Sequence, residues 1–169
     1  MTNGLRAVTI LTSVFLLLAG AGWALGQDGK VNDNFLLLMG ARNAAKAKEY
    51  DRSVARYERL LEKDPGLTEA RTELGWVQVQ AGQLDQARKQ FETVLATNPG
   101  DAGALKGLLE VSKKLGQKDE AFKVLEQLVK VLPEDRDLRM QLAVELHNRG
   151  KYAEAEKHLN ILLRKDEKK

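Results

Sequence analysis

The sequence predicts an all-α fold, a solenoid built from four consecutive helical hairpins. Two observations support it. Turn glycines recur 34 residues apart at Gly82, Gly116 and Gly150, and all three prolines of the chain share one position of that repeat. Between these marks, apolar residues recur at the three- and four-residue spacing of amphipathic helices. A single hairpin would leave its apolar face in water, so neighbouring hairpins are expected to stack around a shared core.

The repeat divides the chain into units that each hold a first and a second helix. Proline marks the end of the second helix because it cannot continue a helix. In the third unit, Gly103 and Gly107 both fall in the first helix, each costing about 1 kcal/mol relative to alanine. We therefore expect that helix to be the weakest. The predicted segments are a linker at 27–33 and repeats at 34–67, 68–101, 102–135 and 136–169.

The order of small and large residues resembles the tetratricopeptide repeat (TPR) family over residues 34–169. In that family, small residues stand where the two helices cross and large apolar residues stand between them. One position departs from the pattern, because Leu109 stands where a small residue is expected. The resemblance implies a right-handed superhelix whose first helices line a concave surface. The residues that carry it are Ala41, Gly75, Ala143, Ser53, Ala87, Ala121 and Ala155 at the crossings, and Tyr57, Phe91, Leu125 and Leu159 between the helices.

The resemblance also implies a groove that binds a protein or peptide partner. Trp76 offers a large, rigid contact area of the kind that dominates interfaces, although packing between neighbouring helices explains it equally well. The lysines of the third repeat either meet acidic groups of a partner or are simply solvated. The groove positions are Leu38, Arg42, Lys46, Trp76, Val79, Gln80, Lys106, Glu110, Lys113, Lys114, Met140, Val144, His147 and Asn148.

Composition argues against several other classes of protein. The net charge is only +3, and basic residues are not gathered in the pattern typical of nucleic-acid-binding proteins. The chain has no cysteine, which excludes disulfides and thiol nucleophiles. His147 and His158 fall on different helices without an acidic cluster at metal-ligand spacing, and no phosphate-binding motif is present. The sequence therefore predicts a protein that is not an enzyme and has no catalytic residue, cofactor or metal.

The N-terminal residues 1–26 have the order of an export signal. A lone Arg6 is followed by an apolar run and then by small residues up to Gly26, after which we expect cleavage. The alternative is an uncleaved membrane anchor, since residues 7–25 carry no charge and are just long enough to span a bilayer. Either way, Arg6 on the cytoplasmic side would send the repeats across the membrane, and we expect them in a bacterial periplasm.

Together these features predict a protein-interaction scaffold or adaptor in the bacterial cell envelope. One alternative is a structural protein that associates with itself, because residues 35–39 and 161–163 are apolar stretches near the two ends of the repeat region. A second alternative is binding of an anionic polymer or membrane surface through the basic fourth repeat and the lysine-rich residues 165–169.

Overall fold

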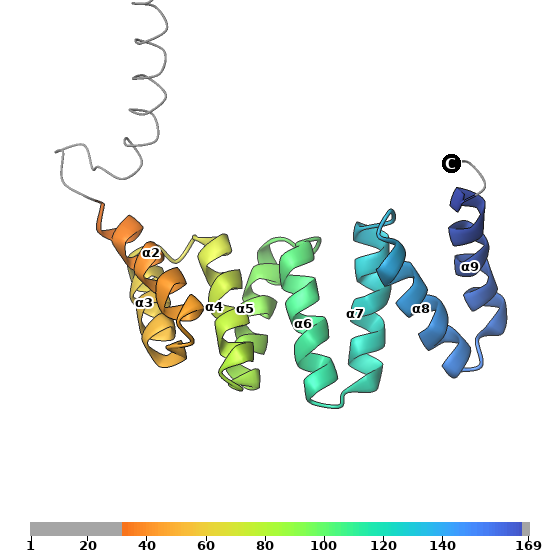
Figure 1. Cartoon of the computed structure of the whole chain (residues 1–169), viewed down its shortest axis with the longest axis horizontal. Coiled ribbons are helices and arrows are strands. Elements are labelled where there is room, and N and C mark those ends of the chain that lie inside the picture. Colours follow the sequence, from red (N-terminus) through yellow and green to blue (C-terminus); the bar gives the residue numbers. More distant parts are fainter. Residues whose placement is uncertain (1–31, 167–169) are drawn as a thin grey trace, which may run out of the picture. The chain divides into compact units, whose positions relative to one another are not determined.

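The computed structural model describes residues 32–166, with side chains described up to residue 163. The prediction for residues 1–26 lies outside this part of the chain. All regular structure within residues 32–166 is helical, which confirms the all-α prediction (Figure 1). The helices are α2 (Asp33–Lys46), α3 (Tyr50–Lys63), α4 (Thr68–Gln80), α5 (Leu84–Thr97), α6 (Ala102–Lys114), α7 (Lys118–Val131), α8 (Arg136–Asn148) and α9 (Tyr152–Asp166).

Consecutive helices pack in pairs: α2 with α3, α4 with α5, α6 with α7 and α8 with α9. The tight turns inside the last three pairs carry Gly82, Gly116 and Gly150 with φ of 77°, 69° and 74°. This left-handed conformation favours glycine because it has no Cβ. Lys48 holds the same position in the first pair, with φ of 60°. The 34-residue glycine spacing thus reflects a recurring turn geometry.

The chain divides after Gly66 into two compact bodies, and the first contains α2 and α3. Its core is small: Tyr57 and Leu60 of α3 are buried, as is Ala41 of α2. Where the helices cross, the buried Ser53 hydroxyl donates to the carbonyl oxygen of Ala41 at 2.9 Å. The small residues predicted at this crossing therefore allow close approach and a direct hydrogen bond.

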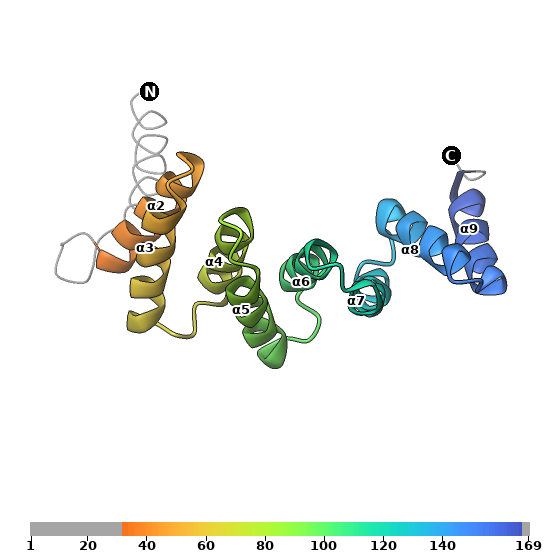
Figure 2. The ribbon, with the colours of Figure 1, turned by 90° about the horizontal axis from the view of Figure 1, so that it is seen from below.

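The second body contains α4 to α9 around one continuous core. Inside this body, the first helix of a hairpin packs against the second helix of the preceding one, α6 against α5 and α8 against α7. Figure 2, which views α6 and α7 nearly end-on, shows these two helices side by side. The shared core runs from Val79 in α4 to Ala155 in α9. The stacked TPR-type arrangement expected from the sequence is therefore present in this body.

The ring of Phe91 is the centre of the joint between α5 and α6. It is fully buried and lies between two glycines. A Cβ on Gly75 would lie 2.7 Å from Cε1 of the ring, and one on Gly107 would lie 2.2 Å from Cζ. Gly107 therefore leaves room for Phe91, so the glycine that we expected only to weaken α6 is required by packing.

Aspartates cap the first helices of the third and fourth hairpins. The Asp101 carboxylate accepts a hydrogen bond from the backbone N–H of Ala104 at 2.8 Å, and Asp135 does the same for Leu138 at 3.1 Å. Such caps satisfy backbone donors that a helix leaves unpaired at its N-terminus. Because the two aspartates stand one repeat apart, they begin α6 and α8 in the same register.

Candidate partner-binding groove

Four of the predicted groove residues meet in one surface hollow of about 290 Å³ in the second body. They come from two first helices, with Trp76 on α4 and the others on α6. The capping aspartate Asp135 and residues of α8 complete the wall. The hollow is lined by Trp76, Lys106, Leu109, Glu110, Lys113, Asp135, Asp137, Leu138 and Gln141.

Trp76 is half-buried and is held from the inside by the core. Its ring meets that of Phe91 edge to face, with centroids 5.7 Å apart and an interplanar angle of 67°. Such aromatic pairs are worth more than their buried area alone. Packing thus fixes the indole at the edge of the hollow, and contact between Trp76 and a partner stays a prediction.

The three lysines of α6 pair with polar or acidic side chains of the same molecule. Lys106 Nζ lies 4.0 Å from Oδ2 of Asp135, and Lys114 Nζ lies 3.5 Å from Oε1 of Glu110. Lys113 donates to Oε1 of Gln141 at 3.2 Å. Since exposed ion pairs contribute little to stability, a partner could exchange with them at small cost. The groove therefore presents mixed charge rather than a bare basic surface.

The remaining predicted groove residues of α4 and α8 have different environments. Val79 is buried in the core, so its prediction as a surface contact is wrong. Met140 and Val144 are exposed one turn apart on α8. His147 lies edge to face with Tyr152, with ring centroids 5.0 Å apart. Gln80, Lys114 and Asn148 are exposed at the C-terminal ends of their helices.

Three predicted groove residues belong to α2 in the first body. Leu38 and Arg42 are half-buried there, and Lys46 is exposed. A hollow of about 390 Å³ in this body lies beside other residues of α2 and α3, including Gly40 and Arg56. The structure thus brings Lys106, Glu110 and Lys113 together with Trp76, whereas the predicted residues of the first repeat belong to the other body.

A second and larger hollow, of about 660 Å³, lies among α6, α7 and α8 and was not predicted. Its apolar wall comes mainly from α7. Leu109 and Lys113 line both this hollow and the one at Trp76. The sequence did carry a signal here, since Leu109 was the departure from the small-residue pattern. The lining consists of Leu109, Ser112, Lys113, Gly116, Lys118, Asp119, Ala121, Phe122, Leu125, Glu145, Asn148 and Arg149.

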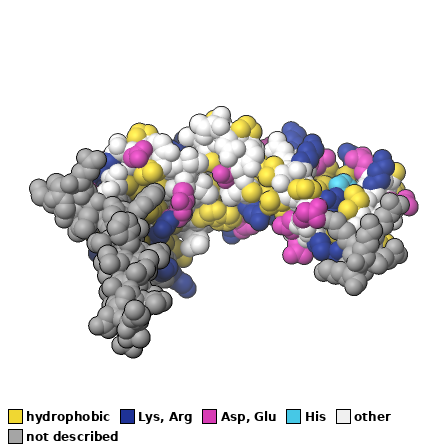
Figure 3. Space-filling view, turned by 90° about the horizontal axis from the view of Figure 1, so that it is seen from above, with side chains coloured by type: hydrophobic (Ala, Val, Ile, Leu, Met, Phe, Trp, Pro, Cys, Tyr) yellow, Lys and Arg dark blue, Asp and Glu magenta, His cyan; other side chains and the backbone are white. Residues whose placement is uncertain are grey.

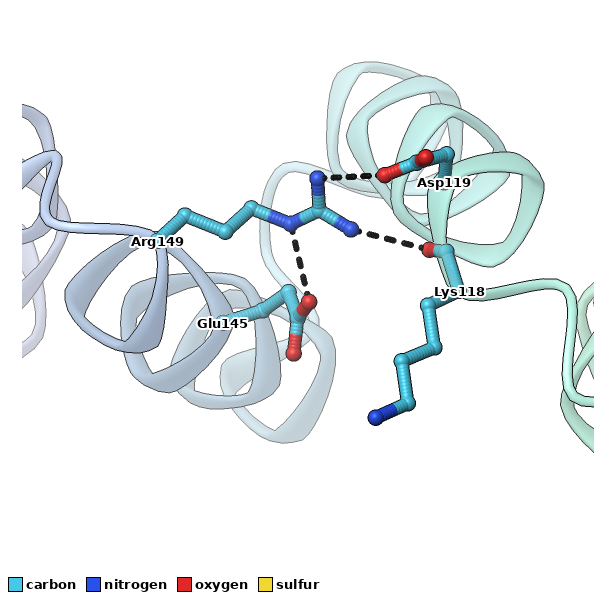
Figure 4. A network of polar contacts seen from close by, with 4 residues as sticks. All are labelled: Lys118, Asp119, Glu145 and Arg149. Atoms are coloured by element: carbon cyan, nitrogen blue, oxygen red, sulfur yellow. Dashed lines mark hydrogen bonds and ion pairs between the residues drawn. The ribbon is translucent and has the colours of Figure 1, made fainter.

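Arg149 bridges this larger hollow with a network that Figure 4 shows from close by. Its guanidinium donates to Asp119 Oδ1 at 2.8 Å and to Glu145 Oε1 at 2.9 Å. A third bond runs to the carbonyl oxygen of Lys118 at 3.0 Å, and the group lies 4.3 Å from the centroid of the Phe122 ring. The hydrogen bond to Asp119, followed by the one to Glu145, raises the pKa of the Arg149 guanidinium above its ordinary value. This residue ties the end of α8 to the start of α7.

Ser112 also belongs to the lining of this hollow. It is fully buried, and its hydroxyl has no hydrogen-bond partner in the part of the chain that the structure describes. Buried polar groups are nearly always paired. The hydroxyl has no accessible surface, so it offers no direct contact to a group in the hollow.

The second histidine takes part in a contact inside the fourth hairpin. Arg139 Nη1 lies 3.4 Å from Nδ1 of His158, and the Arg139 guanidinium also donates to the carbonyl oxygen of Pro133. Burial, followed by the charge of Arg139, lowers the pKa of His158 below its ordinary value of 6.5. At neutral pH this imidazole is uncharged and acts as a structural partner of the arginine.

The described residues form no metal-binding cluster, and their surface mixes apolar and charged side chains. Within residues 32–166 no three His, Cys, Asp or Glu side chains are placed to hold a metal ion. Nor does any helix in this range have the length and apolar character needed to cross a bilayer. On the face in Figure 3, hydrophobic side chains alternate with clusters of both charge signs. Such a surface suits recognition of another molecule by mixed apolar and polar contacts.

Several solved structures share this fold. A crystal structure of MamA is 20% identical, covering 81% of this chain and 80% of that chain with a TM-score of 0.68. MamA from Desulfovibrio magneticus RS-1 is also 20% identical, covering 80% and 77% with a TM-score of 0.65. A tetratricopeptide repeat protein from Parabacteroides merdae is 17% identical, covering 81% and 55% with a TM-score of 0.71. At such identities the likeness shows the fold alone.

Comparison with family models gives a consistent result. One tetratricopeptide repeat model matches residues 44–111 and a second matches residues 112–169. No curated protein matches the chain. Taken with the 34-residue register and the paired helices, these matches show that the chain belongs to the tetratricopeptide repeat family.

Proposed function

We propose that this protein is a non-enzymatic scaffold that binds an extended segment of a partner protein along α4, α6 and α8. One observation carries the proposal: the hollow at Trp76 and the larger hollow at Arg149 share Leu109 and Lys113 as a common wall. A segment crossing this wall could place one side chain in each hollow. Concave sites with an apolar lining and a few polar groups are typical of binding surfaces.

The lining indicates which partner side chains fit. Trp76, Leu109 and Leu138 offer apolar contact in the smaller hollow. Phe122 and Leu125 do so in the larger one. Met140 and Val144 extend the apolar surface along α8. We therefore propose a segment with two large apolar side chains separated by polar residues.

Site-specific photo-crosslinking would test this function. A photoreactive residue at Met140 should capture a partner from the cell-envelope fraction, whereas the same residue at exposed Lys123 on α7 should not. Trp76→Ala should lower that capture at least about tenfold, because a truncated aromatic anchor commonly costs 2 kcal/mol or more. Lys89→Ala, an exposed change on α5, serves as the matched control.

Trp76 also packs on Phe91, so folding must be separated from binding. Trp76→Phe keeps an aromatic edge against Phe91 and should preserve the melting temperature within a few degrees while weakening capture. Equal capture by the Met140 and Lys123 probes, or unchanged capture by Trp76→Ala, would contradict the groove as the binding site.

We further propose that the scaffold works in the bacterial cell envelope, exported or anchored by residues 7–25. The support is the charge and apolar order of residues 1–26. Measuring the mass of the mature chain would distinguish the two forms, since cleavage after Gly26 removes the segment. Protease access to the repeats in spheroplasts but not in intact cells would support the location, and resistance in both would contradict it.

A further inference from the structure

Among the described residues, one stripe of α9 is apolar and exposed. Tyr152, Leu159 and Leu163 lie four and seven residues apart along one face of this helix. All three are exposed, Leu163 to 61%. Ordinary exposed leucines need no explanation, but three large apolar side chains aligned on one helix stripe form a contact surface.

The repeat register shows what covers the same stripe elsewhere in the molecule. The residues 34 positions before Leu159 and Leu163 are Leu125 and Val129 of α7, and both are buried. The residue 34 positions before Leu125 is Phe91 of α5, which is also buried. In each case the first helix of the next hairpin packs there, α8 against α7 and α6 against α5. The α9 stripe is therefore a stacking face, suited to a first-type helix.

The other half of such a joint is exposed on α2. Leu36 is 55% exposed, whereas Ala104 and Leu138, at the same register position of α6 and α8, are 0% and 7% exposed. Met39 is also exposed and stands at the register position of Gly107, which receives the Phe91 ring in α6. The same chain thus carries both faces of a hairpin joint, each exposed.

Side-chain sizes at these two faces differ from one joint within the chain and resemble the other. In the joint between α5 and α6, a large ring at Phe91 meets a glycine at Gly107. Across α9 and α2 of another copy, the smaller Leu159 would meet the larger Met39. This leucine and methionine are close in size to Leu125 and Gln141, which hold the same two register positions in the joint between α7 and α8.

We propose that α2 of a second copy of this chain packs on the α9 stripe, continuing the hairpin stack from one molecule into the next. The contact is head to tail, so it generates a ring if the rotation closes and a filament if it does not. It uses neither hollow of the groove. Self-association and partner capture are therefore separate properties that can fail independently.

The absence of cysteine from the chain makes a direct test possible. Full-length Met39→Cys and Leu159→Cys copies, mixed under mild oxidation, should form a disulfide-linked dimer that neither variant forms alone. Leu159→Cys mixed with Lys123→Cys, on an exposed part of α7, should stay monomeric. Crosslinking of one variant with itself, or no crosslinking in the first mixture, would overturn the head-to-tail contact.

The mass of the particle, measured by light scattering after size-exclusion chromatography, gives a second test. Leu163→Glu and Leu36→Glu each place a charge on one face, and both positions are so exposed that the fold should survive. Each variant should reduce the assembly to single copies without lowering partner capture. The matched control Val144→Glu, exposed on the groove side of α8, should keep the assembly.

Two results would overturn the proposal. One is assembly of the Leu163→Glu protein at the mass of the unmodified chain. The other is loss of assembly in Val144→Glu alone, because self-association would then use the groove. Loss of partner capture with intact assembly in Val144→Glu would instead support the head-to-tail contact and leave the groove as a separate site.

Discussion

The joint between α5 and α6 and the joint between α7 and α8 share one register but are packed differently. In the first, the buried Phe91 ring fills the space beside Gly107. In the second, the equivalent residues are Leu125 and Gln141, and Gln141 is exposed. A hollow of about 660 Å³ lies beside this second joint, bridged by the Arg149 network.

The two joints therefore differ: the first is closed around a filled core, and the second is open beside a hollow. A ring opposite a glycine lets the helices meet through a filled core. Beside the second joint, Leu125 lines a hollow that the hydrogen bonds of Arg149 bridge at the surface. The open joint provides the larger part of the candidate binding surface, while the closed joint fixes Trp76 through Phe91.

The largest expected effect comes from truncating the central side chain of each joint. Phe91→Ala should lower the free energy of unfolding by about 3–5 kcal/mol, because it empties a fully enclosed site. Leu125→Ala should cost nearer to 2 kcal/mol, since its side chain already borders a hollow. Urea denaturation followed by circular dichroism would measure both. Equal losses would mean that the two joints are packed alike.

A smaller effect is expected from filling the space that Gly107 leaves. Gly107→Ala should destabilise the protein by about 1–3 kcal/mol although alanine favours helices, because its Cβ would overlap the Phe91 ring. Gly103→Ala in the same helix is the control. Its Cβ would lie 3.2 Å from Oδ1 of Asp101 and 3.4 Å from Cγ2 of Thr72, so it should be close to neutral.

The double variant Phe91→Leu with Gly107→Ala sharpens this prediction. The smaller side chain at position 91 should recover part of the loss caused by alanine at position 107, since neighbouring changes are not additive. Thermal unfolding of the unmodified chain, the two single variants and the double variant would give the coupling free energy between positions 91 and 107. Additive effects would show that the ring and the glycine do not constrain each other.

The smallest effect concerns an arginine contact that repeats two and four share. Arg71 donates to Gln90 at 3.1 Å, and Arg139 lies against His158 at the same register positions. The folded protein lowers the pKa of His158, so the unfolded chain binds more protons below about pH 6.5. Stability from this contact is therefore complete above that pH and is lost as the solution becomes acidic.

His158→Gln would give repeat four the uncharged partner that repeat two already has. Relative to this variant, the unmodified chain should lose stability between pH 7.5 and pH 5. The nearby Glu154 and Glu126 raise the pKa of His158 and so reduce the size of the effect. Melting temperatures of both proteins across this range would test it, and parallel curves would contradict it.

Much of this molecule could be predicted from sequence because its strongest signals are local. The glycine spacing reflects left-handed turns, and the apolar periodicity agrees with the helices. Of the residues that the family register predicts for a groove, Trp76, Lys106, Glu110 and Lys113 line one hollow, and their contact with a partner stays a prediction. The register placed Val79 wrongly, because periodicity assigns a face but not how far neighbouring helices cover it.

The larger hollow could not be predicted in the same way. Ser112 lies on α6, Phe122 on α7 and Arg149 just after the end of α8, and nothing in their local sequence marks them as neighbours. Their meeting depends on how widely the α7–α8 joint opens. Leu109 was a visible departure from the repeat pattern, but its sequence context does not show that it lines two hollows.

The helical hairpins, their length and their turns follow from the amino-acid sequence, because these depend on backbone preferences and on apolar spacing within a few residues. Which joint is closed and which is open became visible in the packed molecule, because it depends on the volumes of side chains from separate helices. The ring of Phe91 against Gly107 and the guanidinium of Arg149 against Asp119 are contacts of this second kind.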